Sequence, residues 1–203
     1  FIAPDNQTLY FATDGLPGYG NADIFVSRRL DDTWLHWSTP QNLGPEINSV
    51  AWDSYYTVPA DGQYAYMSSY TDGKQKADIY RIPLVIEARP SPVVLLKGQI
   101  IDAHSKKTIP AKIIYEDLIT GEEIGHIRPD PITGAYKMVL PYGKHFGIRA
   151  VCPKYMSVNI ELDLTAQGVY RVIEQNLALE PFEVGQSMRI NNVFFERGKP
   201  ALL

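Results

Sequence analysis

The sequence predicts an all-β protein in two parts, a set of repeated hairpin units followed by an antiparallel β-sandwich. Three observations lead to this fold class. The stretch Asp5–Thr13, DNQTLYFAT, returns as DGQYAYMSS at Asp61–Ser69. Short strand-forming segments alternate with turns rich in Gly, Asp and Pro along the chain. No segment shows the apolar spacing of an amphipathic helix.

The first part is a repeat. In each copy a turn opens on Asp-Asn or Asp-Gly, an aromatic strand follows, and a second strand begins at Ala-Asp after a polar loop. Asp61 lies 56 positions after Asp5, and Asp78 lies 55 positions after Asp23. Repeats of roughly 40 to 60 residues built from short strands are typical of propeller blades, and closure takes about four to eight of them. We therefore expect residues 1–84 to be the last two blades of a partial β-propeller.

The connection between the two copies carries a second pattern. Its residues are Pro40, Asn42, Leu43, Gly44, Ile47 and Asn48, and those of the first copy are Asp5, Leu9, Tyr10, Phe11 and Asp23. Together they resemble PD40 repeats, the WD40-like propeller repeats of periplasmic Bacteroidota proteins. Because the chain opens inside a repeat and without Met, we expect a longer protein, with the other blades upstream of Phe1 or in a partner.

The second part begins after a proline-containing stretch at residues 85–92, which is expected to be a short stiff linker. Apolar runs and turns then alternate over residues 93–180, and about seven short strands at this spacing predict an antiparallel sandwich. The stretch resembles a carboxypeptidase regulatory-like domain, which implies a transthyretin-like β-sandwich without catalytic residues. The resembling residues are Gly98, Asp102, Pro110, Ala111, Thr133, Gly134, Tyr136, Leu140, Pro141 and Gly143.

Residues 181–203 are similar to the first strand of an OmpA-like peptidoglycan-binding domain. The likeness is carried by Ile190, Asn191, Asn192, Phe194, Phe195, Gly198 and Lys199. The residues with which that family holds peptidoglycan lie downstream of such a strand, so none is assigned between residues 1 and 203. Propeller, sandwich and OmpA-like domain occur in this order in PorE-like proteins of the type IX secretion system.

The composition and the motifs argue against several kinds of function. A formal net charge of −4 disfavours nucleic-acid binding, which needs a basic surface. The four histidines, His36, His104, His126 and His145, do not form a zinc motif, and no nucleophile elbow or phosphate loop occurs. We therefore predict no catalytic residue, metal or cofactor. Cys152 stands in an apolar run and is expected to be a buried thiol.

Two groups of side chains leave alternatives open. Asp14, Asp23, Asp72 and Asp78 are candidate calcium ligands, although aspartates in such loops more often cap turns. Five aromatic residues near the inter-blade connection are candidates for a protein or glycan interface, or else fill the wedge between blades. These are Trp34, Trp37, Trp52, Tyr55 and Tyr56.

The resemblances imply a non-catalytic scaffold of the periplasm, associated with the outer membrane as a lipoprotein. It would tether an outer-membrane protein complex, such as the type IX secretion or gliding machinery, to peptidoglycan. A first alternative is a glycan-binding or glycan-processing propeller protein of the cell envelope. A second is an accessory part of a secreted peptidase, which would need a zinc-site domain elsewhere in the gene.

Overall fold

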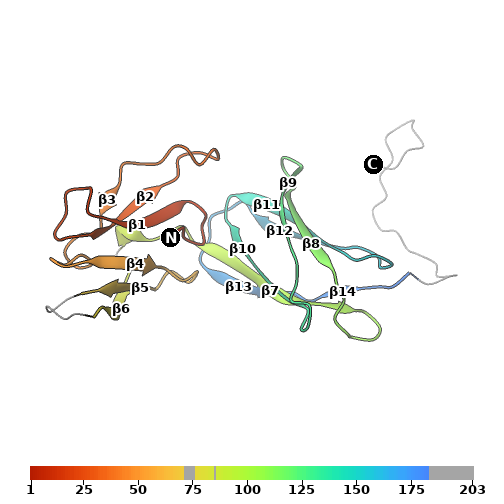
Figure 1. Cartoon of the computed structure of the whole chain (residues 1–203). Coiled ribbons are helices and arrows are strands. Elements are labelled where there is room, and N and C mark those ends of the chain that lie inside the picture. Colours follow the sequence, from red (N-terminus) through yellow and green to blue (C-terminus); the bar gives the residue numbers. More distant parts are fainter. Residues whose placement is uncertain (71–75, 85, 183–203) are drawn as a thin grey trace.

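The computed structural model describes residues 1–70, 76–84 and 86–182, and within them the chain is all-β, as predicted. The strands form two lobes that follow one another along the chain (Figure 1). The first lobe contains β1 (Thr8–Thr13), β2 (Asp23–Arg28), β3 (Gln41–Asn42), β4 (Asp53–Thr57), β5 (Tyr64–Ser69) and β6 (Asp78–Pro83). The second contains β7 (Val93–Asp102), β8 (Lys112–Asp117), β9 (Glu122–Ile127), β10 (Ala135–Pro141), β11 (Lys144–Val151), β12 (Val158–Leu164), β13 (Arg171–Glu174) and β14 (Leu177–Leu179).

The first lobe consists of two antiparallel sheets of three strands each, ordered β1-β2-β3 and β4-β5-β6. The sequence repeat is visible in them, because β1 corresponds to β5 and β2 corresponds to β6. Residues at the start of the chain take the place next to β1 that β4 takes next to β5. The backbone of Phe1 exchanges two 2.9 Å hydrogen bonds with Tyr10, and Thr57 is paired with the corresponding Tyr66.

The two sheets of the first lobe pack face to face in a head-to-tail manner. In the first sheet, we call the face that carries Tyr10 and Ile24 the leading face. In the second sheet, the leading face carries the equivalent residues Tyr66 and Ile79. The opposite face of each sheet is its trailing face. The leading face of the first sheet, with Tyr10, Ile24 and Val26, shares a buried apolar cluster with Tyr56, Ala65 and Met67 of the second sheet. The trailing face of the second sheet therefore covers the leading face of the first.

Buried amide groups fix the connection between the two sheets. The Asn48 side chain accepts a 2.7 Å hydrogen bond from the Ile24 amide and donates one of 3.0 Å to the Ile24 carbonyl. It also donates to Asn42, whose own amide donates to Asp23 at 2.8 Å. Asn48 thus pairs with β2 as a neighbouring strand would. This explains why Asn42 and Asn48 belong to the repeat pattern.

The second lobe is a β-sandwich, as predicted, but it is not antiparallel throughout, because β13 and β14 each pair with β7 in parallel. One layer has β10-β7-β13 with β14 also paired to β7, and the other has the order β12-β11-β8-β9. One apolar core lies between the layers, with Leu96, Ile113, Leu140 and Phe146 among its nearly inaccessible side chains. Cys152 belongs to this core, which confirms the expected buried thiol. None of the four sheets of the described chain closes on itself, so a propeller is not shown.

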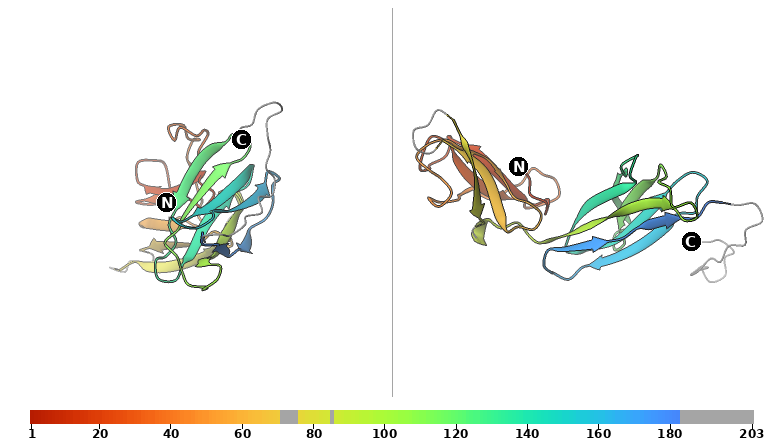
Figure 2. Two further views of the ribbon diagram at one scale, coloured as in Figure 1. Left: turned by 90° about the vertical axis from the view of Figure 1, so that its right-hand side faces the viewer. Right: turned by 90° about the horizontal axis from the view of Figure 1, so that it is seen from below.

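The junction between the lobes is held against the first lobe by hydrogen bonds. The Ser91 amide donates to the Asp5 carboxylate at 2.8 Å, and the Tyr10 hydroxyl donates to the Ala88 carbonyl. Arg28 donates to the Arg89 carbonyl at 2.7 Å. A short 3₁₀ turn, η2 (Ile86–Ala88), lies in the middle of this segment. Figure 2 shows the two lobes end to end on either side of it.

Candidate functional site

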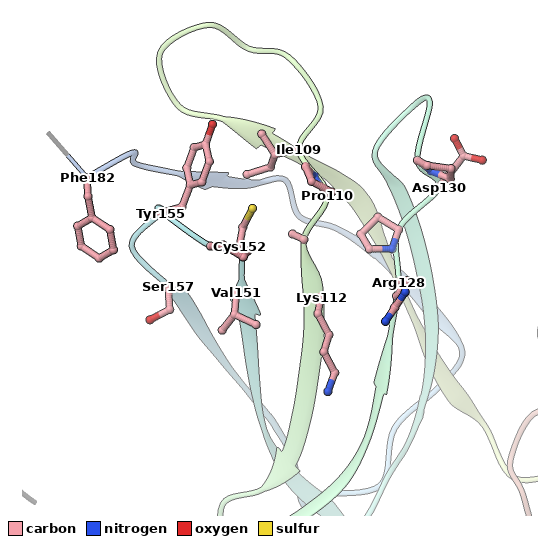
Figure 3. Close-up of a pocket in the computed structure, with 14 residues that line it drawn as sticks. Ile109, Pro110, Lys112, Arg128, Asp130, Val151, Cys152, Tyr155, Ser157 and Phe182 are labelled. Atoms are coloured by element: carbon pink, nitrogen blue, oxygen red, sulfur yellow. The ribbon is translucent and has the colours of Figure 1, made fainter.

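A groove with a volume of about 770 Å³ lies at one end of the sandwich and is the strongest candidate site (Figure 3). It is formed where the chain enters β8, leaves β9 and passes from β11 to β12. Its apolar walls include the aromatic rings of Tyr155 and Phe182. Four prolines also line it, namely Pro110, Pro129, Pro131 and Pro153. Since proline lacks a backbone N–H, these walls offer few donors and favour contact with apolar groups.

Two cations stand on the wall of this groove. Lys112 begins β8 and is paired in register with Val151 of β11. Arg128 follows β9 directly and, because Ile113 is registered with Ile127, it comes next to Lys112 across the strands. Figure 3 shows the two side chains projecting next to each other. Because Lys112 and Arg128 are adjacent, this wall of the groove is positively charged, although the chain as a whole has a net negative charge.

A third cation extends this wall along the outer face of the same sheet. Arg149 lies two positions before Val151 on β11 and is registered with Ile114, which lies two positions after Lys112. Residues two apart on a strand share a face. Within residues 1–70, 76–84 and 86–182, no ion pair or hydrogen bond holds the side chain of Lys112, Arg128 or Arg149. We call these three residues the basic row.

A buried carboxylate fixes one wall of the groove. Asp102 accepts hydrogen bonds from the amides of His104 at 2.9 Å and Ser105 at 2.7 Å, and from the Tyr155 hydroxyl at 2.8 Å. These donors, the Ser105 amide first, lower the pKa of Asp102 to about 2. The same carboxylate raises the pKa of Tyr155, because it accepts a hydrogen bond from the protonated hydroxyl. Asp102 is a positioning residue that sets the orientation of the Tyr155 ring.

The aromatic residues predicted from the sequence lie outside this groove, in four different environments. Trp34 and Trp37 form a tilted pair at the tip of the loop between β2 and β3, with ring centroids 6.0 Å apart. The guanidinium of Arg29 lies 4.7 Å above the Trp34 ring, and the Trp37 indole donates to the Trp34 carbonyl at 2.9 Å. This tip is therefore a structured aromatic stack, with Trp34 43% exposed.

Trp52, Tyr55 and Tyr56 lie along the β4 segment but do not share an environment. Trp52 is half exposed and forms an isolated bridge with Ala22. Tyr55 stands in a break of the β4–β5 register with a φ of 55°, and it is 82% exposed. Tyr56 is buried 4.9 Å from the ring of Tyr10, where burial raises its pKa. Among the described residues the Tyr56 hydroxyl has no hydrogen-bond partner.

The candidate calcium ligands that the structure describes, Asp14, Asp23 and Asp78, form no metal site. Asp23 is buried and accepts hydrogen bonds from the amides of Tyr19 and Gly20 and from Asn42, as a turn-capping residue does. Asp14 and Asp78 are exposed, and Asp72 lies outside the described residues. The described part of the chain holds no group of three or more His, Cys, Asp or Glu side chains that could bind a metal ion. It also contains no helix long and apolar enough to span a membrane.

The sequence interpretation missed the groove and the basic row. Lys112, Arg128 and Arg149 are far apart in the sequence and come together only through the register of three strands. The one local signal is the presence of prolines at positions 110, 129, 131 and 153. The OmpA-like expectation for residues 181–203 falls almost entirely on residues outside the described part.

Comparisons with known proteins find distant structural likenesses only. No family model matches the chain, and no curated protein matches it. The TIE protein of Bacillus anthracis is 11% identical with a TM-score of 0.38, over 87% of this chain and 32% of its own. A C-terminal fragment of the pilus adhesin SpaC from Lactobacillus rhamnosus GG is 10% identical with a TM-score of 0.35, over 88% and 91%.

Enzymes also occur among these likenesses. The 3-chlorocatechol 1,2-dioxygenase of Rhodococcus opacus 1CP is 10% identical with a TM-score of 0.34, over 46% of this chain and 61% of its own. The chain thus spans less than two thirds of that dioxygenase. At such TM-scores none of these likenesses assigns a function.

Proposed function

We propose that the chain is part of a non-catalytic periplasmic scaffold that links an outer-membrane protein complex to peptidoglycan. The order of the three sequence resemblances supports this role, since a propeller and a sandwich provide docking surfaces and an OmpA-like module provides the anchor. The structural observation that carries the proposal is the clamped junction between the lobes. Hydrogen bonds from Ser91 to Asp5 and from Tyr10 to Ala88 hold the junction, which leads directly into β7 of the sandwich, against the first lobe.

We propose further that residues 1–84 are two successive blades of a propeller. The comparison of equivalent positions supports this. On the leading faces, Ile24 is 0% exposed while its counterpart Ile79 is 81% exposed, and Tyr10 is 1% exposed while Tyr66 is 40% exposed. The leading face of the second sheet thus exposes positions that the first sheet buries. Another sheet of the same kind would cover it, as successive blades of a propeller do.

A pair of matched substitutions tests the blade proposal. In the chain of residues 1–203, Ile24→Ala should lower the free energy of unfolding by about 2–5 kcal/mol, because it leaves a cavity. Ile79→Ala should change it by less than about 0.5 kcal/mol, as is usual for an exposed side chain. In the complete gene product, Ile79→Ala should become as costly as Ile24→Ala. An Ile79→Ala variant that stays neutral there contradicts the blade proposal.

The tether is tested by sedimentation with purified peptidoglycan. The complete gene product that contains these residues should co-sediment with the sacculi, and the same protein ended after Gln186 should remain in the supernatant. Cell fractionation should recover it with the outer membrane. Unchanged co-sedimentation of the shortened protein rejects the assignment of the anchor to the segment that follows Gln186.

A glycan-binding role is the second candidate, and the exposed aromatic rings of Trp52 and Tyr55 favour it. Aromatic faces of this kind can stack on sugar rings. A glycan array probed with the chain, and with a Trp52→Ala and Tyr55→Ala double variant, separates the two roles. Specific glycan signals that disappear in the double variant favour the second candidate, and an array without signals leaves the scaffold as the better proposal.

A further inference from the structure

We propose that the groove and the basic row of the sandwich bind an acidic peptide segment of a partner protein in an extended conformation. The inference does not depend on the proposed function. It combines three features of one end of the sandwich: the apolar groove, the unpaired cations on its wall, and the open edge of the neighbouring strand β9. Each feature determines one property of the ligand.

The open edge of β9 favours a ligand that has a polypeptide backbone. β9 is the last strand of the order β12-β11-β8-β9, so within the described chain it pairs with β8 alone. Its outer N–H and C=O groups are available to a further strand, which is a common way for a sheet to bind an extended peptide. A carbohydrate or a lipid headgroup cannot continue this hydrogen-bond ladder.

The basic row calls for carboxylates at one end of that peptide. Arg128 directly follows β9, and Lys112 lies across the strands from it. At the other end of β9, Glu122 and Glu123 are exposed and would repel acidic side chains. A peptide added to β9 should therefore carry its acidic residues near Arg128 and neutral or basic residues near Glu122. Because Arg128 follows the C-terminal end of β9, a peptide with its acidic residues at its own C-terminus pairs with β9 in parallel.

The apolar groove calls for a large apolar side chain next to the acidic residues. Tyr155 and Phe182 and the four prolines line a space of about 770 Å³, which is large enough for a leucine or an aromatic side chain. Asp102 holds the hydroxyl of Tyr155, so one wall is preorganised before the ligand arrives. Preorganisation of this kind lowers the entropic cost of binding.

Fluorescence anisotropy with a labelled octapeptide of sequence TVTVDLEE tests the proposal on the chain of residues 1–203. The native chain should bind it, and the affinity should fall as salt rises. The double variant Lys112→Gln and Arg128→Gln should bind about tenfold more weakly, as expected for the loss of two partly exposed charge pairs. The matched control, Lys76→Gln with Arg171→Gln, removes the same charges elsewhere and should bind like the native chain.

Two further probes separate a peptide site from general anion capture. The peptide TVTVNLQQ should bind as weakly as the original peptide binds the double variant, because it lacks the carboxylates. The original peptide with N-methyl groups at alternate residues should bind at least about tenfold more weakly, since it cannot continue the β9 ladder. Circular dichroism confirms that each variant is folded. Absence of binding to the native chain overturns the proposal. The proposal is also overturned if heparin and the N-methylated peptide bind as tightly as the original peptide, because the site would then capture anions in general.

Discussion

At the scale of single residues, Asn48 shows how one side chain can replace a strand. It satisfies both the amide and the carbonyl of Ile24, and it is 4% exposed. Asn48→Ala should therefore leave the buried Ile24 amide without a partner, whereas the Ile24 carbonyl still accepts a 3.1 Å hydrogen bond from the Leu43 amide. We expect a loss of about 1–3 kcal/mol in the free energy of unfolding, measured by urea denaturation.

Two comparisons complete this prediction. Asn159→Ala, at an exposed position of β12, should change the stability by less than about 0.5 kcal/mol. Asn48→Asp keeps an acceptor for the Ile24 amide but places a buried carboxylate oxygen against the Ile24 carbonyl and the Asn42 oxygen, so its loss should be at least as large as that of Asn48→Ala. Equal stabilities for Asn48→Ala and Asn159→Ala would show that the connection does not depend on this side chain.

Asp102 makes the stability of the sandwich dependent on pH. Its pKa in the folded chain is about 2, below the usual value of roughly 3.9 in an unfolded chain. A carboxyl whose pKa is lowered by folding stabilises the fold above the unfolded value, and this contribution is lost as the pH falls toward the folded value. The melting temperature should therefore fall between pH 4 and pH 2 less steeply in Asp102→Asn than in the native chain. Parallel melting curves for the two proteins would contradict this.

At the scale of the strands, β7 is held by two short parallel partners that meet beside a glycine. β13 pairs with the first half of β7 and β14 with the second half. Between them the backbone of Gln175 approaches Gly98 so closely that an added Cβ would lie 1.8 Å from the Gln175 oxygen. The Tyr136 hydroxyl donates to that same oxygen at 2.6 Å. This contact explains the break between β13 and β14.

Substitution at this glycine should separate β13 and β14 from β7. We expect Gly98→Ala to lower the free energy of unfolding by about 1–3 kcal/mol, as overpacking does. Hydrogen exchange should show faster exchange at the amides of Arg171–Glu174. In the control Gly15→Ala, the added Cβ would have no neighbour nearer than the Thr13 hydroxyl at 3.3 Å. Native stability in Gly98→Ala would mean that the strands move apart at little cost.

The strands show where sequence reasoning succeeds and where it stops. The four strands of the repeated hairpins were predictable, because alternating apolar residues and turn residues such as Asp61 and Gly62 are local signals. The division of the last segment of the sandwich into β13 and β14 was not, because it depends on a contact between Gly98 and Gln175, which are distant in the sequence. The groove could not be predicted for the same reason, since Lys112 and Arg128 become neighbours only through strand register.

At the scale of the whole molecule, hydrogen bonds hold the junction between the lobes against the first lobe. Tyr10 is buried and its hydroxyl donates to the Ala88 carbonyl, while the equivalent Tyr66 is 40% exposed. Tyr10→Phe removes one hydrogen bond of about 1 kcal/mol. The Ser91 amide, which donates to Asp5, should then exchange with solvent about fivefold faster by NMR.

The repeat supplies the control for this prediction. Tyr66→Phe makes the same chemical change at the equivalent position of the second sheet, where the hydroxyl is part of a 40% exposed residue and donates no hydrogen bond to any described residue of the junction. Exchange of the Ser91 amide should stay at its native rate in that variant. Equal acceleration in both variants would show that the two lobes are not held by the Tyr10 hydroxyl.

The head-to-tail stacking of the first two sheets has a consequence for the isolated polypeptide in solution. The leading face of the second sheet exposes Tyr66 and Ile79, whereas Phe25 on the trailing face of the first sheet is only 3% exposed, so the two end faces of the lobe are unlike. A contact between unlike surfaces of two molecules repeats without closing unless the rotation returns to its start. Concentrated solutions therefore have a physical route to linear filaments. The guanidinium of Arg81, which lies 4.7 Å above the Tyr64 ring on the leading face of the second sheet, must lose water before two molecules join, and this charge opposes polymerisation.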